Sequence, residues 1–237
     1  MNISFKKISI IGLGLIGTSI LHCIRQKLDK EVVTYAYDIE SEHRSIVSEM
    51  GIASFVCHNI SDAVKEAELI ILAIPVGSME TVAKLISPHL KENVIITDTG
   101  STKASVIKDV SINLPENVSF IPSHPIAGTE FSGPKAGFGS LFENRYWLIV
   151  SEIKNENIHK LSNFFTDLGS KVEIVSIDYH DKILAITSHL PHLIAYTIVG
   201  TASDLETDLK NDVIKYSASG FRDFTRIASS NPIMWRD

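Results

Sequence analysis

The stretch of sequence that decides the fold is residues 8–20, ISIIGLGLIGTSI. It begins inside an apolar segment, Lys6–Ile11, which has the length and composition of a buried β-strand. The strand runs directly into GLGLIG, residues 12–17, and the apolar periodicity of Leu15–Gln26 predicts a helix immediately afterwards. A GxGxxG that closes a strand and opens a helix predicts a dinucleotide-binding unit.

Each glycine of this loop meets a physical requirement of dinucleotide binding. Gly12 permits the tight turn, Gly14 lets the backbone approach a pyrophosphate, and Gly17 lets the helix pack closely against the strand. The first helical residues, Leu15 and Ile16, present backbone N–H groups and the positive end of the helix dipole to the phosphates. We therefore expect all five residues to bind the cofactor.

Asp38 is the candidate for recognising the adenine ribose. It ends a second predicted strand, Val32–Tyr37, and lies 21 residues after Gly17, as a ribose-binding acid should. A carboxylate there accepts hydrogen bonds from the 2′-OH and repels a 2′-phosphate, so we expect NAD rather than NADP. The alternatives are that Asp38 only caps the helix starting near Ser41, and that Arg44 reaches a 2′-phosphate instead of facing solvent.

Downstream of this unit, short apolar segments alternate with helical patterns of about ten residues. The alternation predicts an α/β fold of the Rossmann type, a doubly wound parallel sheet with helices on both faces. Further strands are expected over Leu69–Ala73, Val94–Thr97, Ser119–Ile121, Tyr146–Val150 and Lys171–Val175, and further helices over Ser41–Met50, Ser78–Ile86, Ala104–Leu114 and Asn157–Leu168.

Strand patterns stop near residue 176, and an all-α C-terminal domain is expected to follow. We divide the chain into a dinucleotide-binding domain, residues 1–176, and a helical substrate-binding and dimerisation domain, residues 177–237. Helices are predicted over Asp178–Asp204, with a kink at Pro191, and over Asp208–Tyr216. The final NPIMWRD reads as the first turn of another helix, which indicates that this domain is shortened at its C-terminus.

The apolar segment 183–200 predicts an oligomer. It is too apolar to face water, and so few helices cannot cover it within one chain, so we expect a homodimer. The segment is near membrane length, but four polar side chains would lie in mid-bilayer, namely those of Thr187, Ser188, His189 and His192. We therefore interpret it as a buried helix of a soluble, cytoplasmic protein without a membrane partner.

Composition narrows the function classes further. The 237 residues carry a net charge of −6, which argues against nucleic acid as a partner, because neutralising phosphates needs surplus Lys and Arg. Two cysteines in a chain of this length do not make a disulfide framework, and we recognise no secretory signal in the first residues. The net negative charge does not exclude a small anionic substrate, because binding one needs only one or two positively charged side chains nearby.

Two further loops are expected to lie beside the dinucleotide. DTGSTK, residues 98–103, follows the strand Val94–Thr97, and SHPIAGTE, residues 123–130, follows the strand Ser119–Ile121. In open parallel sheets, ligands sit beyond the carboxyl ends of the strands. The sequence therefore places both loops where a substrate would meet the cofactor.

These motifs together resemble prephenate and arogenate dehydrogenases. IGLGLIG and LAIPV are generic to Rossmann dehydrogenases, whereas HPIAGTE, SHLPH (188–192) and GFRDFTRIA (220–228) are specific in combination. DTGSTK and the final PIMWRD match as well, so the resemblance covers the whole chain. The chain departs from the family where serines replace glycines in SASG, residues 217–220, and where most members continue for several helical turns after WRD.

The resemblance implies a reaction and assigns roles to residues. The ring hydroxyl of a cyclohexadienol is oxidised, hydride passes to NAD, and carbon dioxide leaves as the ring becomes aromatic. His124 would accept the hydroxyl proton, with Ser101 hydrogen-bonding the hydroxyl or orienting the imidazole. Arg226 offers a bidentate contact to a substrate carboxylate, and His189 would bind the other end of the substrate. Glu130 would pair with an arginine and gate access.

Other interpretations of these residues stay open. His124 could be an ordinary loop histidine, and Arg226 could belong to a salt-bridged surface. His189 and His192 share a helix face, but a third ligand is not evident, so we expect no metal site. We assign no role to Lys103.

Three alternative functions also stay open. The first is arogenate (cyclohexadienyl) dehydrogenase, although the NAD-type Asp38 favours prephenate by analogy. The second is a β-hydroxyacid type of dehydrogenase, which generally carries a lysine base on a central helix of the second domain. The third is a non-catalytic, NAD-binding regulator, in which the base and the anion site should be degraded. Preference between the two substrates, tyrosine feedback and the effect of the short C-terminus are not decided by the sequence.

Overall fold

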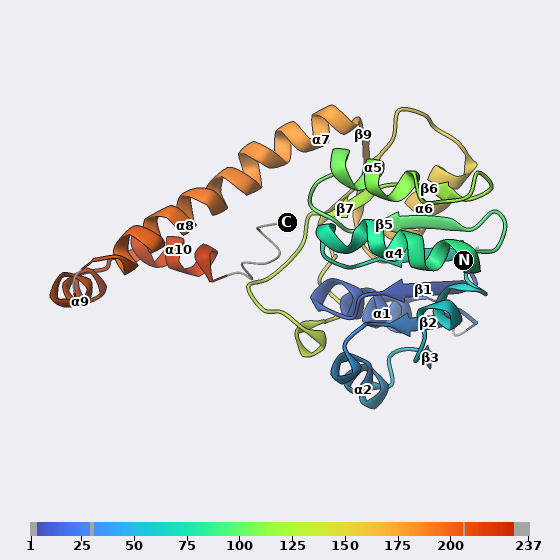
Figure 1. The fold of residues 1–237 in the computed structure, drawn as a ribbon, viewed down its shortest axis with the longest axis horizontal. Helices are drawn as coiled ribbons and strands as arrows, with labels where there is room; N and C mark the ends of the chain where they lie inside the picture. Colours follow the sequence, from blue (N-terminus) through green and yellow to red (C-terminus); the bar gives the residue numbers. More distant parts are fainter. Residues whose placement is uncertain (1–3, 29–30, 206, 230–237) are drawn as a thin grey trace.

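The computed structural model describes residues 4–28, 31–205 and 207–229. Its main body is a six-stranded parallel sheet in the order β3-β2-β1-β4-β5-β6 (Figure 1). The order reverses direction between β1 and β4, as in doubly wound folds. The strands are β1 (Lys7–Ile11), β2 (Val33–Tyr37), β3 (Phe55–Val56), β4 (Leu69–Leu72), β5 (Ile95–Asp98) and β6 (Ser119–Phe120).

Helices cover both faces of this sheet, because the central strands are apolar on both sides. One apolar core lies between the sheet and α1, and the other between the sheet and α3, α4 and α5. The predicted Rossmann-type class is therefore confirmed. The helices of this part are α1 (Leu15–Lys27), α2 (Ser41–Met50), α3 (Ile60–Val64), α4 (Met79–Ile86) and α5 (Ala104–Ser111).

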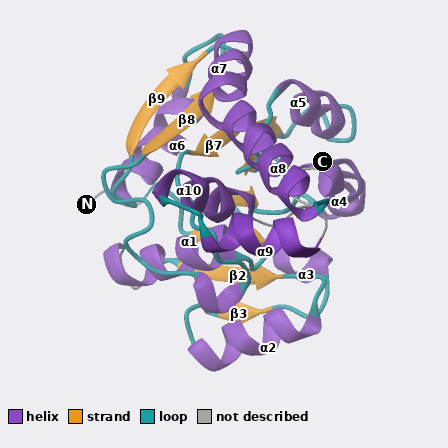
Figure 2. Ribbon diagram, turned by 90° about the vertical axis from the view of Figure 1, so that its left-hand side faces the viewer, coloured by secondary structure: helices purple, strands orange, loops and turns teal. Residues whose placement is uncertain are grey.

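A second, three-stranded sheet follows, which the sequence did not separate from the first. It contains β7 (Ser123–Pro125), β8 (Tyr146–Val150) and β9 (Lys171–Val175), with α6 (Glu156–Asp167) between the last two strands. β7 pairs with β8 antiparallel, whereas β8 and β9 are parallel. Figure 2 shows β8 and β9 at the opposite end of the molecule from β2 and β3. This small sheet presents β7 beside the carboxyl end of β5.

The chain then enters one long helical segment, residues 177–203. It consists of α7 (Ile177–Leu184), a π-helical turn over Ala185–His189, and α8 (Leu190–Ser203). The helix thus widens in the turn before Pro191, whose missing N–H and bulky ring disturb the preceding turn. Two shorter helices follow, α9 (Thr207–Lys215) and α10 (Ser219–Ala228), and α10 packs against α8. The residues after 229, including the WRD motif, lie outside the described part of the chain.

The long helix is not covered within the single chain, which agrees with the expectation that so few helices cannot cover it. It projects away from the main sheet (Figure 1), and large apolar side chains such as Ile186 and Leu193 are 66% and 65% exposed. By length and composition alone, residues 177–203 could also cross a membrane. The physical reason for the exposure is that α9 and α10 are the elements beside α8, and two short helices cover little of its surface.

Candidate active site

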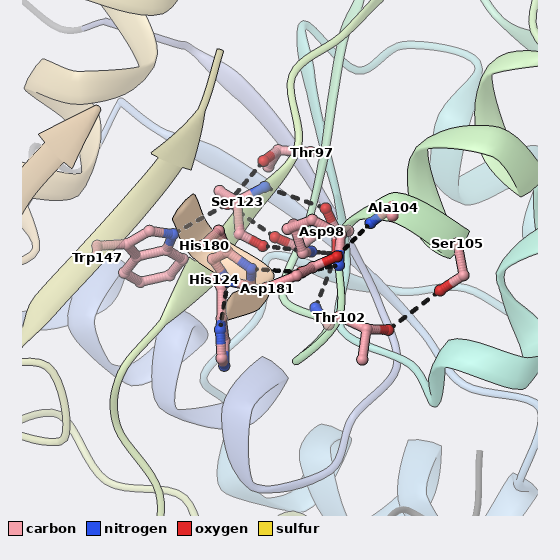
Figure 3. Close-up of polar contacts among 12 residues, drawn as sticks. Thr97, Asp98, Thr102, Ala104, Ser105, Ser123, His124, Trp147, His180 and Asp181 are labelled. Atoms are coloured by element: carbon pink, nitrogen blue, oxygen red, sulfur yellow. Dashed lines mark hydrogen bonds and ion pairs between the residues drawn. The ribbon is translucent and has the colours of Figure 1, made fainter. Parts of the chain in front are cut away.

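The carboxyl end of β5 carries a buried aspartate that joins three segments. Asp98 is fully buried, and its carboxylate accepts hydrogen bonds from the backbone N–H of Gly100 at 2.8 Å and of Ser123 at 3.1 Å. The same carboxylate forms an ion pair with the ammonium group of Lys103. Asp98 therefore fastens the loop 98–103 to the start of β7 (Figure 3).

Lys103 is a structural residue of this site that the sequence left without a role. Its side chain is fully buried, and its Nζ also donates to the carbonyl oxygen of Ser123 at 2.9 Å. Burial lowers the pKa of Lys103, while the charge of Asp98 opposes that shift. A charged pair at the two ends of one short loop was the available signal, because such a pair can close the loop upon itself.

Ser123 locks β7 onto the main sheet. Its hydroxyl donates to the carbonyl oxygen of Asp98 at 2.8 Å and accepts a hydrogen bond from the indole Nε1 of Trp147 at 3.0 Å. The hydroxyl of Thr97 lies 2.9 Å away. Because all these atoms are buried, the position of the next residue, His124, is closely determined.

His124 is partly buried on β7, and its Nδ1 lies 3.0 Å from Nε2 of His180. Burial holds the pKa of His124 well below its usual value, and the positive charge of Lys103 lowers it further. The imidazole is therefore neutral at neutral pH. A neutral imidazole with a free nitrogen can act as a general base.

His180 and Asp181 belong to the same cluster, although sequence reasoning did not single them out. Both lie on α7, and Nδ1 of buried His180 is 2.8 Å from Oδ1 of Asp181. The Asp181 carboxylate also accepts the backbone N–H groups of Lys103 at 2.9 Å and Ala104 at 3.0 Å. A His-Asp pair in the first turn of an apolar helix was the available signal.

The other predicted site residues lie at different distances from this cluster. Ser101 is in the loop between Asp98 and Lys103, and among the described residues it makes no hydrogen bond to His124. His189 ends the π-helical turn, and its charge contributes to lowering the pKa of His124. His189 therefore belongs near the base.

Arg226 and Glu130 are not part of the buried cluster. Arg226 lies exposed on α10, which runs beside α8 and away from β7 (Figure 1). Glu130 is exposed in the loop after β7, and the ion pairs found among the described residues do not join it to Arg222 or Arg226. Within one chain, the residues predicted to bind a substrate carboxylate and to control access are thus separate from the candidate base.

The glycine loop has the geometry that a dinucleotide requires. Gly12 has φ +97°, and an added Cβ would lie 2.2 Å from the carbonyl oxygen of Ala73. A Cβ on Gly17 would lie 1.9 Å from the carbonyl oxygen of Gly12, whereas a Cβ on Gly14 would meet nothing within 4 Å. Gly12 and Gly17 are therefore required by close packing, whereas Gly14 leaves open space for a ligand at the N-terminus of α1. Leu15 and Ile16 form the first turn of that helix.

Asp38 lies beside the glycine loop. Its carboxylate accepts the backbone N–H of Leu13 at 2.7 Å and of Glu40 at 2.9 Å, and Nδ1 of His43 is 3.2 Å away. A carboxylate offers about four acceptor positions, so one stays available to a ribose hydroxyl. Arg44 donates instead to the carbonyl oxygens of Asp38 and Ile39, at 2.6 and 3.0 Å. These residues fit NAD. Among the described residues, no cluster of three metal-ligating side chains was found.

Two family models match consecutive parts of the chain. The model described as prephenate dehydrogenase, nucleotide-binding domain, matches residues 23–174. The model described as prephenate dehydrogenase, dimerization domain, matches residues 176–237. Together the two matches cover most of the sequence.

Individual relatives agree with the family models. The cyclohexadienyl dehydrogenase of Zymomonas mobilis is 40% identical over 98% of this chain and 80% of its own length. The prephenate dehydrogenase of Bacillus subtilis is 32% identical over 100% of this chain and 64% of its own length. The structure of prephenate dehydrogenase from A. aeolicus, in complex with hydroxyphenyl propionate and NAD+, is similar with a TM-score of 0.89 at 32% identity; the match covers 100% of this chain and 82% of that one.

Proposed function

The chain belongs to the prephenate dehydrogenase family, and we propose that it catalyses the NAD-dependent oxidative decarboxylation of prephenate to 4-hydroxyphenylpyruvate, a step in tyrosine biosynthesis. The observation that carries the proposal is the neutral imidazole of His124, held near the carboxyl end of β5 in a chain that also has the complete glycine loop. The same arrangement argues against a non-catalytic NAD-binding regulator, because such a protein would not be expected to retain the catalytic base.

The reaction needs one proton acceptor and one hydride acceptor. We assign the proton of the ring hydroxyl to Nε2 of His124, because Nδ1 is already engaged with His180. Bound NAD supplies the hydride acceptor. Hydride loss would turn the ring carbinol into a carbonyl. The ring carboxylate would leave as carbon dioxide, and the electron pair of the broken C–C bond would make the ring aromatic and convert the carbonyl oxygen into a phenolate, which takes up a proton to become the product hydroxyl. Ser101 would hydrogen-bond the reacting hydroxyl from the loop that Lys103 and Asp98 hold.

The residues assigned to the cofactor are Gly12, Gly14, Leu15, Ile16, Gly17 and Asp38. Gly14 and the first turn of α1 would receive the pyrophosphate, and Asp38 the adenine ribose. Arg44 donates to the main-chain carbonyls of Asp38 and Ile39, so its guanidinium lies beside the ribose acid, and the preference for NAD rests on the carboxylate of Asp38.

The substrate-binding residues would be His189, Arg226 and Glu130. His189 lies close enough to affect the titration of His124, whereas Arg226 and Glu130 are exposed in the single chain. We propose that Arg226 binds a substrate carboxylate once the helical domain is assembled with a second copy, and that Glu130 controls access. The division into residues 1–176 and 177–237 is retained as part of this proposal.

A homodimer is supported by the exposure of α8 and by the match of residues 176–237 to a dimerization domain. The alternative is that a lipid membrane covers the exposed apolar side chains, because the segment 177–203 is apolar and long enough to cross a bilayer. The polar side chains of Thr187, Ser188, His189 and His192 favour a protein partner over lipid. We therefore propose a cytoplasmic homodimer.

Arogenate is the second candidate substrate, because the Zymomonas mobilis relative is named a cyclohexadienyl dehydrogenase. An acid such as Glu130 or Asp223 near the side-chain end would favour its ammonium group. A β-hydroxyacid type of reaction is less well supported. Lys103 is committed to Asp98, and Lys182 of α7 is an exposed residue 3.7 Å from Asp178, so neither supplies a free lysine base.

The test is NADH formation at 340 nm with prephenate and with arogenate, together with measurement of released carbon dioxide. We expect one carbon dioxide per NADH and a higher kcat/KM for prephenate. A preference for arogenate above about tenfold, or about 1.4 kcal/mol of differential transition-state binding, would replace the first substrate with the second. NADH formation without carbon dioxide would contradict the proposed reaction class.

A further inference from the structure

We propose that Asp181 and His180 are positioning residues that fix the tautomer of His124, so that its Nε2 is the unprotonated nitrogen offered to the substrate. The inference rests on the proposed function for its catalytic consequence. The tautomer itself is a property of the folded chain and can be tested without substrate.

The hydrogen-bonded chain has a definite starting point at Asp181. Burial opposes ionisation of this carboxyl group, but hydrogen bonds from Ala104, His180 and Lys103 lower its pKa below the usual value. Asp181 is therefore an ionised, acceptor-only group. The nitrogen that faces it, Nδ1 of His180 at 2.8 Å, must carry a hydrogen, because two acceptors at that distance would repel each other.

The rest of the chain of hydrogen bonds follows from this first assignment. Burial lowers the pKa of His180, so the ring is neutral and carries a single hydrogen. That hydrogen is on Nδ1, which makes Nε2 of His180 an acceptor. Nδ1 of His124, 3.0 Å away, must then be the donor, and the second nitrogen of His124 keeps its lone pair. The tautomer follows from the heavy-atom positions by this argument.

Asp181 also ties this tautomer to the substrate-facing loop. Its two oxygens accept the backbone N–H groups of Lys103 and Ala104, at the end of the loop that contains Ser101. Lys103 in turn bonds to Ser123, the neighbour of His124. The orientation of the imidazole and the position of the loop are therefore set by one connected group of residues (Figure 3).

The surroundings of His124 keep it unprotonated. Burial and the charge of Lys103 lower its pKa, and the negative charge of Asp181 opposes that shift. When His124 accepts a proton, its Nδ1–H donates to His180, which keeps its own bond to Asp181. The negative charge of Asp181 thus stabilises the imidazolium through His180, as the aspartate does in catalytic triads.

The experiment compares Asp181→Asn, His180→Phe and wild type. Asp181→Asn removes the negative charge that holds the hydrogen of His180 on Nδ1, and so weakens the preference of His124 for the tautomer protonated at Nδ1. We expect kcat to fall by at least about 10²-fold, with NAD affinity unchanged. The acid limb of the kcat profile should move to lower pH, because Asp181 raises the pKa of His124.

His180→Phe is the second variant, because it leaves the contacts of Asp181 with Lys103 and Ala104 in place. We expect a similar loss, and the double variant should be no worse than Asp181→Asn, since the two residues act as a unit. Asp178→Asn, an exposed carboxylate on the same helix, is the matched control and should leave kcat unchanged. Multiplicative losses with an unmoved acid limb would show a merely structural role and overturn the proposal.

A readout without substrate separates this inference from the proposed function. In ¹⁵N NMR of the wild-type protein bound to NAD, we expect His124 to be protonated at Nδ1 and not at Nε2. Asp181→Asn should raise the fraction of His124 that is protonated at Nε2. Protonation of wild-type His124 at Nε2 would overturn the tautomer proposal, whatever the enzyme does with prephenate. The expected NMR pattern in an enzyme inactive on both substrates would instead remove only the proposed function.

Discussion

The carboxyl end of β5 and the long helix after it obtain their contacts in different ways. At β5, Asp98, Lys103 and Ser123 are wholly buried, and their polar groups bond to one another within the chain. On α8 and the turn before it, apolar side chains such as Ile186 and Leu193 are mostly exposed. The candidate base and the glycine loop are therefore built within one chain, whereas much of the surface of the long helix is left uncovered by the described part of the chain.

Replacing the candidate base should give the largest effect of the predicted variants, on kcat. His124→Asn removes the proton acceptor but leaves the glycine loop intact, so kcat should fall by about 10²- to 10⁴-fold with unchanged NAD affinity. The measurement is kcat by NADH absorbance together with NAD titration, with exposed His159→Asn as the control. Near-normal turnover of His124→Asn would show that the base lies elsewhere.

The next effect concerns stability of the same region. Lys103→Met leaves Asp98 buried without its counter-charge, which should lower the free energy of unfolding by about 3–5 kcal/mol. The measurement is urea unfolding, and Lys182→Met is the control because its ion pair is exposed and about 3.7 Å long. Equal stability of the two variants would mean that the buried pair does not hold the loop.

In the second region, Arg226→Ala should act on substrate binding alone. Loss of a bidentate contact to a carboxylate is expected to raise KM for prephenate by about 30-fold or more and to change kcat little. Arg222→Ala, one turn away on the same helix, is the comparison variant. If KM stays unchanged in Arg226→Ala, its guanidinium does not meet the substrate.

The smallest effect is expected at the cofactor. Asp38→Ser removes the charge that repels a 2′-phosphate, so the ratio of kcat/KM for NAD to that for NADP should fall by about tenfold or more. Glu40→Ser, whose side chain is exposed next to the same strand, should keep the wild-type ratio. A wild-type preference for NADP would overturn the ribose assignment.

Much of the fold could be predicted because its signals are local. GLGLIG between a strand and a helix, and the alternation that follows, depend on neighbours within about ten residues. The second sheet was missed as a separate unit because β7 has three residues and pairs antiparallel with β8, where His124 lies opposite Leu148. Such long-range pairing leaves little trace in a short strand.

The same distinction applies to the candidate site. His124 and the glycines could be named because they lie in compact motifs. His180 and Asp181 acquire their roles through contacts with residues 56 and 78 positions away, which a pattern along the sequence does not reveal. The helix of residues 183–200 was expected to need a second copy, because it is apolar and the chain has too few helices to cover it. Its exposure could be predicted from composition, whereas the residues that would cover it could not.

The most direct test of the comparison is to dilute the wild-type protein over a range in which a dimer would dissociate, while measuring three properties in the same samples. Sedimentation gives the fraction of dimer, NAD titration reports the glycine loop, and NADH formation from prephenate reports the complete site. The account predicts that NAD affinity per chain stays constant, while activity per chain falls in proportion to the dimer. Full activity in samples that sediment as monomer would contradict it.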